Sequence, residues 1–287
     1  MRGLVAIYRK EMGHYFVSPI AYMVAGVFLV LTGFFFYQFV VIFMENALQA
    51  TMQGMRMGRA PEIDVPGLVI RNFFGLLGTV ILFVAPMLTM GNYTEEKKRG
   101  TMELLMTSPL RELDIVLGKF FATLSLFALM LLPTALYQAV LFLSSEPRPP
   151  WRLILAGYLG VLLLGGVLIA LGGFLSSLTE NQIVASMTTF GLFLILWVID
   201  IGARGSSSAM GEVLQYVSIL RHYDDFTRGV IDTSGLIFYA SMIVLGLFLT
   251  HRSVDALRWS SGSAGILLRC WRSSEGGAQS SAQTRRF

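Results

Sequence analysis

The sequence predicts an all-α membrane protein with six transmembrane helices, and two observations carry that prediction. Hydrophobic residues make up 54% of the 287-residue chain and charged residues only 14%, whereas soluble proteins carry about 25% charged residues. The charges are also segregated, because six long runs contain no Asp, Glu, Lys or Arg. A helix crosses a hydrocarbon core of about 30 Å with roughly 20 apolar residues and satisfies its own backbone in lipid. The charge-free runs are residues 15–44, 72–94, 120–145, 153–179, 181–199 and 233–250.

Each run is interpreted as one span of a transmembrane domain over residues 19–250. The last two runs are short enough for a buried or re-entrant helix, but six spans place both termini on one side and agree with the charge distribution. The first run is much longer than the apolar part of a signal peptide, about 7–15 residues, so we expect it to remain in the mature protein. The expected spans are about 20–43, 72–93, 120–143, 153–176, 183–199 and 234–250.

The connectors between these spans differ in basic residues. Those on the side of the termini hold 14 Lys and Arg, and those on the other side hold 8. The more basic side of a membrane protein faces the cytoplasm, so we expect a multi-pass protein of the cell inner (plasma) membrane with both termini cytoplasmic. Residues 251–287 form the expected cytoplasmic tail, which is rich in Ser, Gly and Arg after 260 and is predicted to be largely disordered there.

Residues 1–18 are predicted to form an amphipathic helix lying in the membrane interface. Ser18 and Pro19 then favour the start of the first span, as N-cap and first helical residue. Glu11 departs from the pattern because it projects from the apolar side. It is either snorkelling from a frayed turn or ion-paired with a basic residue of the 94–119 connector. The apolar face holds Leu4, Ile7, Tyr8, Met12 and Tyr15, opposite Arg2, Arg9 and Lys10.

Two further regions carry local signals. Residues 45–71 are expected to form a connector, with turn structure at 60–67, where two prolines and a glycine cluster. The fourth span carries small residues four positions apart, which lets another helix approach closely. These pairs are Ala156/Gly160, Gly166/Ala170 and Gly173/Ser177.

The connector 200–232 is predicted to contain short re-entrant helices. Residues 213–220 are too apolar for a solvated loop, but the charges around them exclude a seventh span. We expect Arg221 or Arg228 to pair with Asp224 or Asp225 and to hold this segment as an outer gate. The alternative is a structural cap on spans five and six.

Several function classes lack their required residues. Ion-coupled carriers usually keep ionisable groups at membrane depth, and the charge-free runs contain none. Gly118-Lys119 does not complete a phosphate-binding loop, because Leu113 stands at its leading Gly position and Phe120 where Ser or Thr is needed. No catalytic arrangement lies within the spans, and Cys270 is the single cysteine. We expect no enzyme activity, no metal site and no cofactor in this chain.

The most informative segment is the connector between spans two and three, residues 92–111. Gly100 is predicted to end the extended second helix in a left-handed conformation, and Thr101 to cap a new short helix with Glu103 in its first turn. Ser108-Pro109 begins the helix that leads into span three. The product is an apolar knob held on two spans, formed by Met102, Leu104, Leu105 and Met106.

Here the sequence resembles the permease subunits of type-2 ABC exporters, and among them the gliding-motility-associated permeases. The resemblance covers about residues 4–258. Its marks are Arg9-Lys10-Glu11 and Ser18-Pro19; Glu95, Arg99-Gly100-Thr101, Glu103 and Ser108-Pro109; Gly118-Lys119; and the stretches 176–182 and 226–232.

The resemblance implies a permease that moves a substrate, most naturally outward, powered by a separate ATP-binding subunit. The ATPase would bind ATP and magnesium, and two permeases, as a homodimer or with a second membrane subunit, would rock between inward- and outward-facing states. Nucleic acid is not an expected partner; membrane lipid is. The residues that the resemblance assigns to ATPase coupling are Glu11, Glu95, Arg99, Gly100, Thr101, Met102, Glu103, Leu104, Leu105, Met106 and Pro109.

Two alternatives share parts of this pattern. A non-transporting scaffold, in which the ATPase transmits force to an outer partner, would have the same motifs. An ion-coupled carrier or channel is disfavoured by the uncharged runs. The substrate is not specified, because the neutral polar residues of the spans serve equally as cavity or packing groups. They are Gln38, Thr79, Thr89, Ser125 and Gln138.

Overall fold

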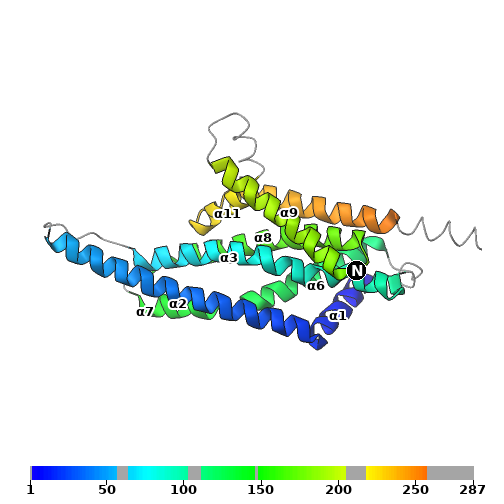
Figure 1. Ribbon diagram of the computed structural model, residues 1–287, viewed down its shortest axis with the longest axis horizontal. Helices are drawn as coiled ribbons and strands as arrows, with labels where there is room; N and C mark the ends of the chain where they lie inside the picture. Colours follow the sequence, from blue (N-terminus) through cyan, green and yellow to red (C-terminus); the bar gives the residue numbers. More distant parts are fainter. Residues whose placement is uncertain (1, 57–63, 103–110, 146–147, 205–217, 257–287) are drawn as a thin grey trace, which may run out of the picture.

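The computed structural model describes residues 2–56, 64–102, 111–145, 148–204 and 218–256, and every regular element in these ranges is an α-helix (Figure 1). The helices run along the long axis of an elongated bundle, with α1 angled across one end. They are α1 (Arg2–Val17), α2 (Pro19–Arg56), α3 (Val65–Thr89), α4 (Gly91–Lys98), α6 (Glu112–Leu131), α7 (Thr134–Ser144), α8 (Trp151–Leu178), α9 (Gln182–Arg204), α11 (Ile219–Thr227) and the last helix, Thr233–Ala256.

Six helical segments in the described part of the chain are long and apolar enough to cross a membrane, which confirms the predicted number. The second joins α3 to α4 and the third joins α6 to α7, so both extend well past the charge-free runs. The segments are Pro19–Met55, Val65–Lys98, Glu112–Ser144, Trp151–Leu178, Gln182–Ile199 and Thr233–Ala256.

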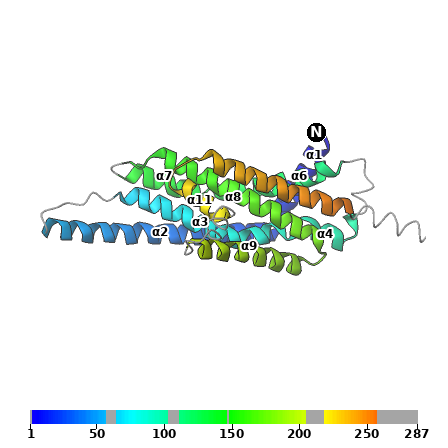
Figure 2. The same ribbon diagram turned by 90° about the horizontal axis from the view of Figure 1, so that it is seen from above.

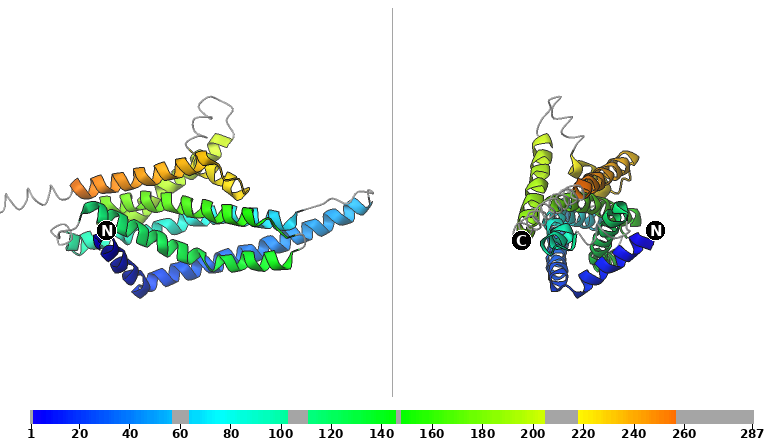
Figure 3. Two further views of the ribbon diagram at one scale, coloured as in Figure 1. Left: turned by 180° about the vertical axis from the view of Figure 1, so that it is seen from behind. Right: turned by 90° about the vertical axis from the view of Figure 1, so that its right-hand side faces the viewer.

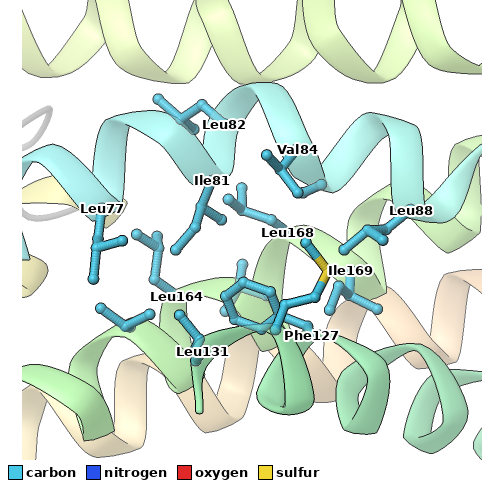
Figure 4. Close-up of a cluster of buried hydrophobic side chains, with 14 of the residues drawn as sticks. Leu77, Ile81, Leu82, Val84, Leu88, Phe127, Leu131, Leu164, Leu168 and Ile169 are labelled. Atoms are coloured by element: carbon cyan, nitrogen blue, oxygen red, sulfur yellow. The ribbon is translucent and has the colours of Figure 1, made fainter. Parts of the chain in front are cut away.

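Helices α3, α6 and α8 form the centre of the bundle. Their inward side chains make one continuous apolar core, and Phe127 of α6 lies between residues of the other two helices (Figure 4). The small residues predicted along α8 are all buried there. A Cβ on Gly165 would lie 2.3 Å from the Phe127 ring, so this close approach requires glycine.

Helices α2 and α9 lie at the outside of the bundle (Figures 2 and 3). Only 11% of the most apolar window of α2 is buried inside the protein, against 61% for each of the three central spans. Apolar side chains that point outward along a helix of this length suit a lipid environment, where lipid replaces protein as the apolar neighbour.

The 45–71 connector is shorter than predicted. Helix α2 continues to Arg56, and α3 begins at Val65. The Asp64 side chain accepts a hydrogen bond of 3.0 Å from the Gly67 backbone, and Pro66 fits the first turn, where its missing N–H has no helical partner. Residues 65–67 are therefore helical, not turn.

The third span is interrupted at Pro133. Helix α6 ends at Leu131 and α7 begins at Thr134, because proline lacks the N–H that would continue the hydrogen-bond ladder. The Ala135 amide donates to the Leu132 carbonyl, three residues back, at 3.1 Å. The two halves of this span are separate helical segments.

Candidate functional site

Helix α1 contacts α6 through a group of charges that is buried except for Lys10. We call this group, which consists of Lys10, Glu11, Glu96 and Lys119, the lysine cluster. The Lys119 side chain is 3% exposed and lies 3.0 Å from a Glu11 oxygen and 3.1 Å from a Glu96 oxygen. Lys10 donates to the other Glu96 oxygen at 2.8 Å. Two lysines and two carboxylates are thereby brought together from α1, α4 and α6.

The Glu11 ion pair with the 94–119 segment is confirmed, with Lys119 as the partner. Helix α6 begins at Glu112, ahead of the charge-free run, and therefore includes Lys119. A buried ammonium is tolerated only when paired. Glu11 and Glu96 provide that pairing; the contribution of Glu96 was not predicted.

Neutral groups complete the surroundings of Lys119. Its Nζ donates to the Glu11 side chain at 3.0 Å and to the Asn92 carbonyl at 2.7 Å, while the nearby Glu96 oxygen contributes as an ion-pair contact. The Tyr15 hydroxyl donates to the Asn92 side chain at 2.9 Å and lies 2.9 Å from the Thr123 hydroxyl. Burial raises the pKa of Tyr15 well above its ordinary value. This hydroxyl therefore stays protonated as a donor.

Gly118 explains why α1 sits so close to α6. A Cβ at this position would lie 2.8 Å from the Ile7 side chain, and Ile7 itself is buried. The Gly118-Lys119 pair thus forms the contact site for α1: Gly118 leaves room for Ile7, and Lys119 pairs with Glu11.

Lys10 stands at the edge of the cluster. Partial burial lowers the pKa of its ammonium, but the hydrogen bond and charge of Glu96, with the charge of Glu11, outweigh this and raise the pKa above its ordinary value. Lys10 therefore remains protonated throughout the neutral range and keeps the cluster electrically balanced.

Glu95 connects the same end of α4 to two other helices. It accepts a hydrogen bond of 2.9 Å from the Gln182 side chain at the start of α9. It also lies 3.7 Å from both His14 of α1 and Arg99. The predicted site residues Glu11, Glu95 and Arg99 therefore gather at one end of the bundle.

The turn after α4 has the predicted left-handed glycine. Gly100 has φ 66°, and its amide donates to the Lys97 carbonyl at 3.1 Å. The Thr101 hydroxyl donates to the Glu96 carbonyl at 3.3 Å. Met102 was expected on the outward knob, but it is 6% exposed and packs with Tyr93 and Val254.

The remaining predicted coupling residues and the predicted helix start at Ser108-Pro109 lie outside the described residues. They are Glu103, Leu104, Leu105, Met106 and Pro109, together with Ser108.

The serine pair at the end of α8 joins α4 to the last helix. The Ser176 hydroxyl donates to the Met90 carbonyl at 3.1 Å and accepts from the Tyr93 amide at 3.2 Å. The Ser177 hydroxyl lies 2.8 Å from that of Ser253. Ser177 was expected to allow close helix packing, whereas Ser176 was identified only through the family resemblance; in the structure both hydroxyls contact other helices.

A cleft of about 300 Å³ opens beside the lysine cluster. Charged and polar side chains line one part of it, and apolar side chains of α2, α3 and α6 line the other. Its polar lining includes Lys10, His14, Glu95, Arg99 and Gln182, and its apolar lining includes Ile20, Ala21, Val24, Met87 and Leu126.

Helix α11 lies toward the opposite end of the molecule from α1 (Figure 1). Ser218 caps it by accepting from the Arg221 amide at 3.2 Å. Arg228 pairs with Asp224 at 2.6 Å, which confirms one of the expected ion pairs. The Asp225 backbone carbonyl accepts a hydrogen bond of 3.0 Å from the Val230 amide.

Two aromatic residues anchor α11 in the bundle. The Tyr223 hydroxyl donates to the Phe74 carbonyl at 2.5 Å, and Cβ atoms on Gly78 and Gly160 would meet Tyr223 and Phe226 at 2.4 and 2.6 Å. Ser218 and Thr227 are also buried. The helix is inserted between α3 and α8, which the apolar residues alone did not predict.

Among the described residues, no group of three or more His, Cys, Asp or Glu could hold a metal ion. The expectations of no enzyme activity and no cofactor stay predictions.

The fold defines a multi-pass helical membrane protein with six candidate spans and with the lysine cluster at one end of the bundle. Residues 5–251 match the family described as ABC-2 family transporter protein. The chain belongs to this family, and its class is therefore an ABC permease that works with an ATP-binding partner. A comparison with curated proteins found no match.

Proposed function

We propose that this chain is the permease subunit of an ATP-driven exporter similar to the gliding-motility-associated permeases, with the ATPase in a separate polypeptide. Family membership and six apolar spans support the transporter class. The excess of Lys and Arg on the side of the termini supports a cytoplasmic location for the α1 end, in the inner membrane. The permease itself carries out no chemistry; ATP and magnesium are bound by the partner.

The lysine cluster is the observation that supports coupling between the ATPase and the membrane spans. Lys119 joins α1, α4 and α6 through direct contacts, and the 103–110 segment connects the last two of these elements in sequence. A partner that pushes on this segment therefore acts on spans two and three together and on α1 through Glu11.

The ATPase contact is assigned to Leu104, Leu105 and Met106, since apolar residues beside a charged connector suit a protein partner. Met102 is not assigned to the ATPase contact, because it packs inside the bundle and holds the start of the 103–110 segment in place.

Closure of the ATPase pair on nucleotide biases two permeases, identical or paired with a second membrane subunit, between inward- and outward-facing states. Helix α11, held by the Arg228–Asp224 pair, is proposed as an outer gate that dips into the bilayer. Helix α1 is proposed to lie in the membrane interface.

Replacement of Leu104 and Leu105 by Asp tests the contact. We expect loss of ATPase co-purification with unchanged yield of folded permease, because a charged pair cannot enter an apolar cleft without a partner. The matched control changes Val230 and Ile231 to Asp, an adjacent exposed apolar pair beyond α11. Undiminished co-purification of the Leu104/Leu105 variant would refute the docking assignment.

Transport is tested separately. ATP-dependent uptake of substrate into inverted vesicles separates an exporter from a force-transmitting scaffold, and uptake that persists without any ATPase subunit would favour an ion-coupled carrier.

A further inference from the structure

The cleft beside the lysine cluster is lined by both charged and apolar side chains. Its apolar wall includes Ile20, Ala21 and Val24, which follow Pro19 at the start of the first span. These residues therefore lie where the hydrocarbon of a bilayer begins. Lys10 and His14 of α1 line the other part of the same cleft.

The cations of this cleft are more accessible than its carboxylates. The Lys10 and Arg99 side chains are 60% and 68% exposed, and each has a carboxylate partner, Glu96 and Glu95 respectively. The Glu11 and Glu96 side chains are nearly covered and contact Lys119, and Glu95 is 30% exposed. A ligand that enters the cleft therefore reaches the Lys10 and Arg99 side chains more readily than the carboxylates.

Size also limits the ligand. At about 300 Å³ the cleft is at the small end of ligand sites, which span about 300–1,000 Å³. It accommodates a compact charged head and the first part of an apolar chain. The remainder of the chain would lie along the sparsely buried α2.

We propose that this cleft binds one anionic phospholipid from the bilayer leaflet that borders the α1 end. The phosphate lies between Lys10 and Arg99, and the upper part of an acyl chain lies against Ala21, Val24 and Met87. The site is formed by the permease alone and does not depend on where the ATPase docks. A bound lipid would fill the gap between α2 and α4 and support α1 from its open side.

The test is native mass spectrometry of the purified full chain in detergent, titrated with phosphatidylglycerol or phosphatidylcholine. Ala21→Trp fills the apolar part of the cleft without changing charge. Its matched control is Met23→Trp, on the outward face of the same helix turn, where Met23 is 71% exposed. Lys10→Gln removes a rim charge, and its control is Arg9→Gln, which is exposed but does not line the cleft.

Wild-type protein is expected to retain one phosphatidylglycerol more strongly than phosphatidylcholine. A single Lys or Arg near an anionic headgroup changes lipid affinity by about fivefold, so Lys10→Gln should weaken phosphatidylglycerol binding by about that factor. Arg9→Gln and Met23→Trp should match wild type, and Ala21→Trp should lose the bound lipid.

Three results overturn the proposal: equal retention of the two lipids, retention by Ala21→Trp at the wild-type level, or equal losses in Lys10→Gln and Arg9→Gln. Because no ATPase is present in this measurement, failure of the lipid site and failure of ATPase docking are distinguishable.

Discussion

Lys119→Met is the most direct test of the lysine cluster, which joins α1, α4 and α6. The side chain is 3% exposed and contacts two carboxylates. Its removal leaves Glu11 and Glu96 close together with only Lys10 to balance them. Loss of one partner from a buried ion pair destabilises by about 3–5 kcal/mol, because the remaining charge is buried without compensation. For a protein of this size, that corresponds to a fall in melting temperature on the order of 10 °C.

The assay is thermal unfolding of the purified permease in detergent, compared at one scan rate because such unfolding is often irreversible. Lys98→Met is the matched control: Lys98 is exposed at the end of α4, and surface changes usually stay within about 0.5 kcal/mol. The triple variant Glu11→Gln, Glu96→Gln, Lys119→Met removes the uncompensated charge. It should recover most of the lost stability.

Two results would contradict the reasoning. Lys119→Met could melt within the range of Lys98→Met, which would mean that the cluster adds nothing to stability. Alternatively, the triple variant could be less stable than Lys119→Met, which would mean that packing of Lys119, rather than its charge, is what matters.

Three further predictions concern α11 and α1. Tyr223→Phe removes one of the donors to the Phe74 carbonyl, which also accepts a bond within helix α3. It should lower the free energy of unfolding by about 0.5–1.5 kcal/mol, whereas Tyr22→Phe, at an exposed position, should have little effect; equal melting temperatures would count against the anchoring role. A cysteine at Val230, which is 55% exposed, in a Cys270→Ser background should react with an impermeant thiol reagent added outside intact cells, and reaction only from the cytoplasmic side would reverse the topology. The pKa of Lys10 is raised in the folded state, so its charge stabilises the fold below the ordinary pKa of 10.5, and this effect fades as the pH rises through the folded-state pKa. The stability difference between wild type and Lys10→Gln should therefore persist at pH 7 and shrink above about pH 10.5. A difference that is independent of pH would show that the charge of Lys10 is not its cause.

The sequence predicted those features that follow from local pattern. Charge-free runs gave the six spans, and Gly100 gave the left-handed end of α4. The partner of Glu11 was predicted only as one of several basic residues, because period and spacing do not show which helix faces which. Lys119 and Glu96 are 23 positions apart in sequence, and their contact exists only once α4 and α6 lie side by side.

Several helices extend beyond the charge-free runs for a physical reason. The runs mark where charge is absent, whereas a helix continues wherever its backbone and side chains are satisfied. Arg71 lies inside α3 and Lys119 inside α6. Likewise, Tyr223 gave no signal in the sequence, since its place depends on Gly78 of another helix.

The break at Pro133 divides one membrane span between two sets of neighbours. Helix α6 is packed against α1 and α8, while α7 is packed against α2 and α3. A rigid rod would carry any tilt at one end to the other, but a span with a missing hydrogen bond at its middle can bend there. Helix α6, which carries Lys119, can therefore change its tilt while α7 keeps its contacts with α2 and α3. The two halves of the third span are thus able to move separately about the break at Pro133.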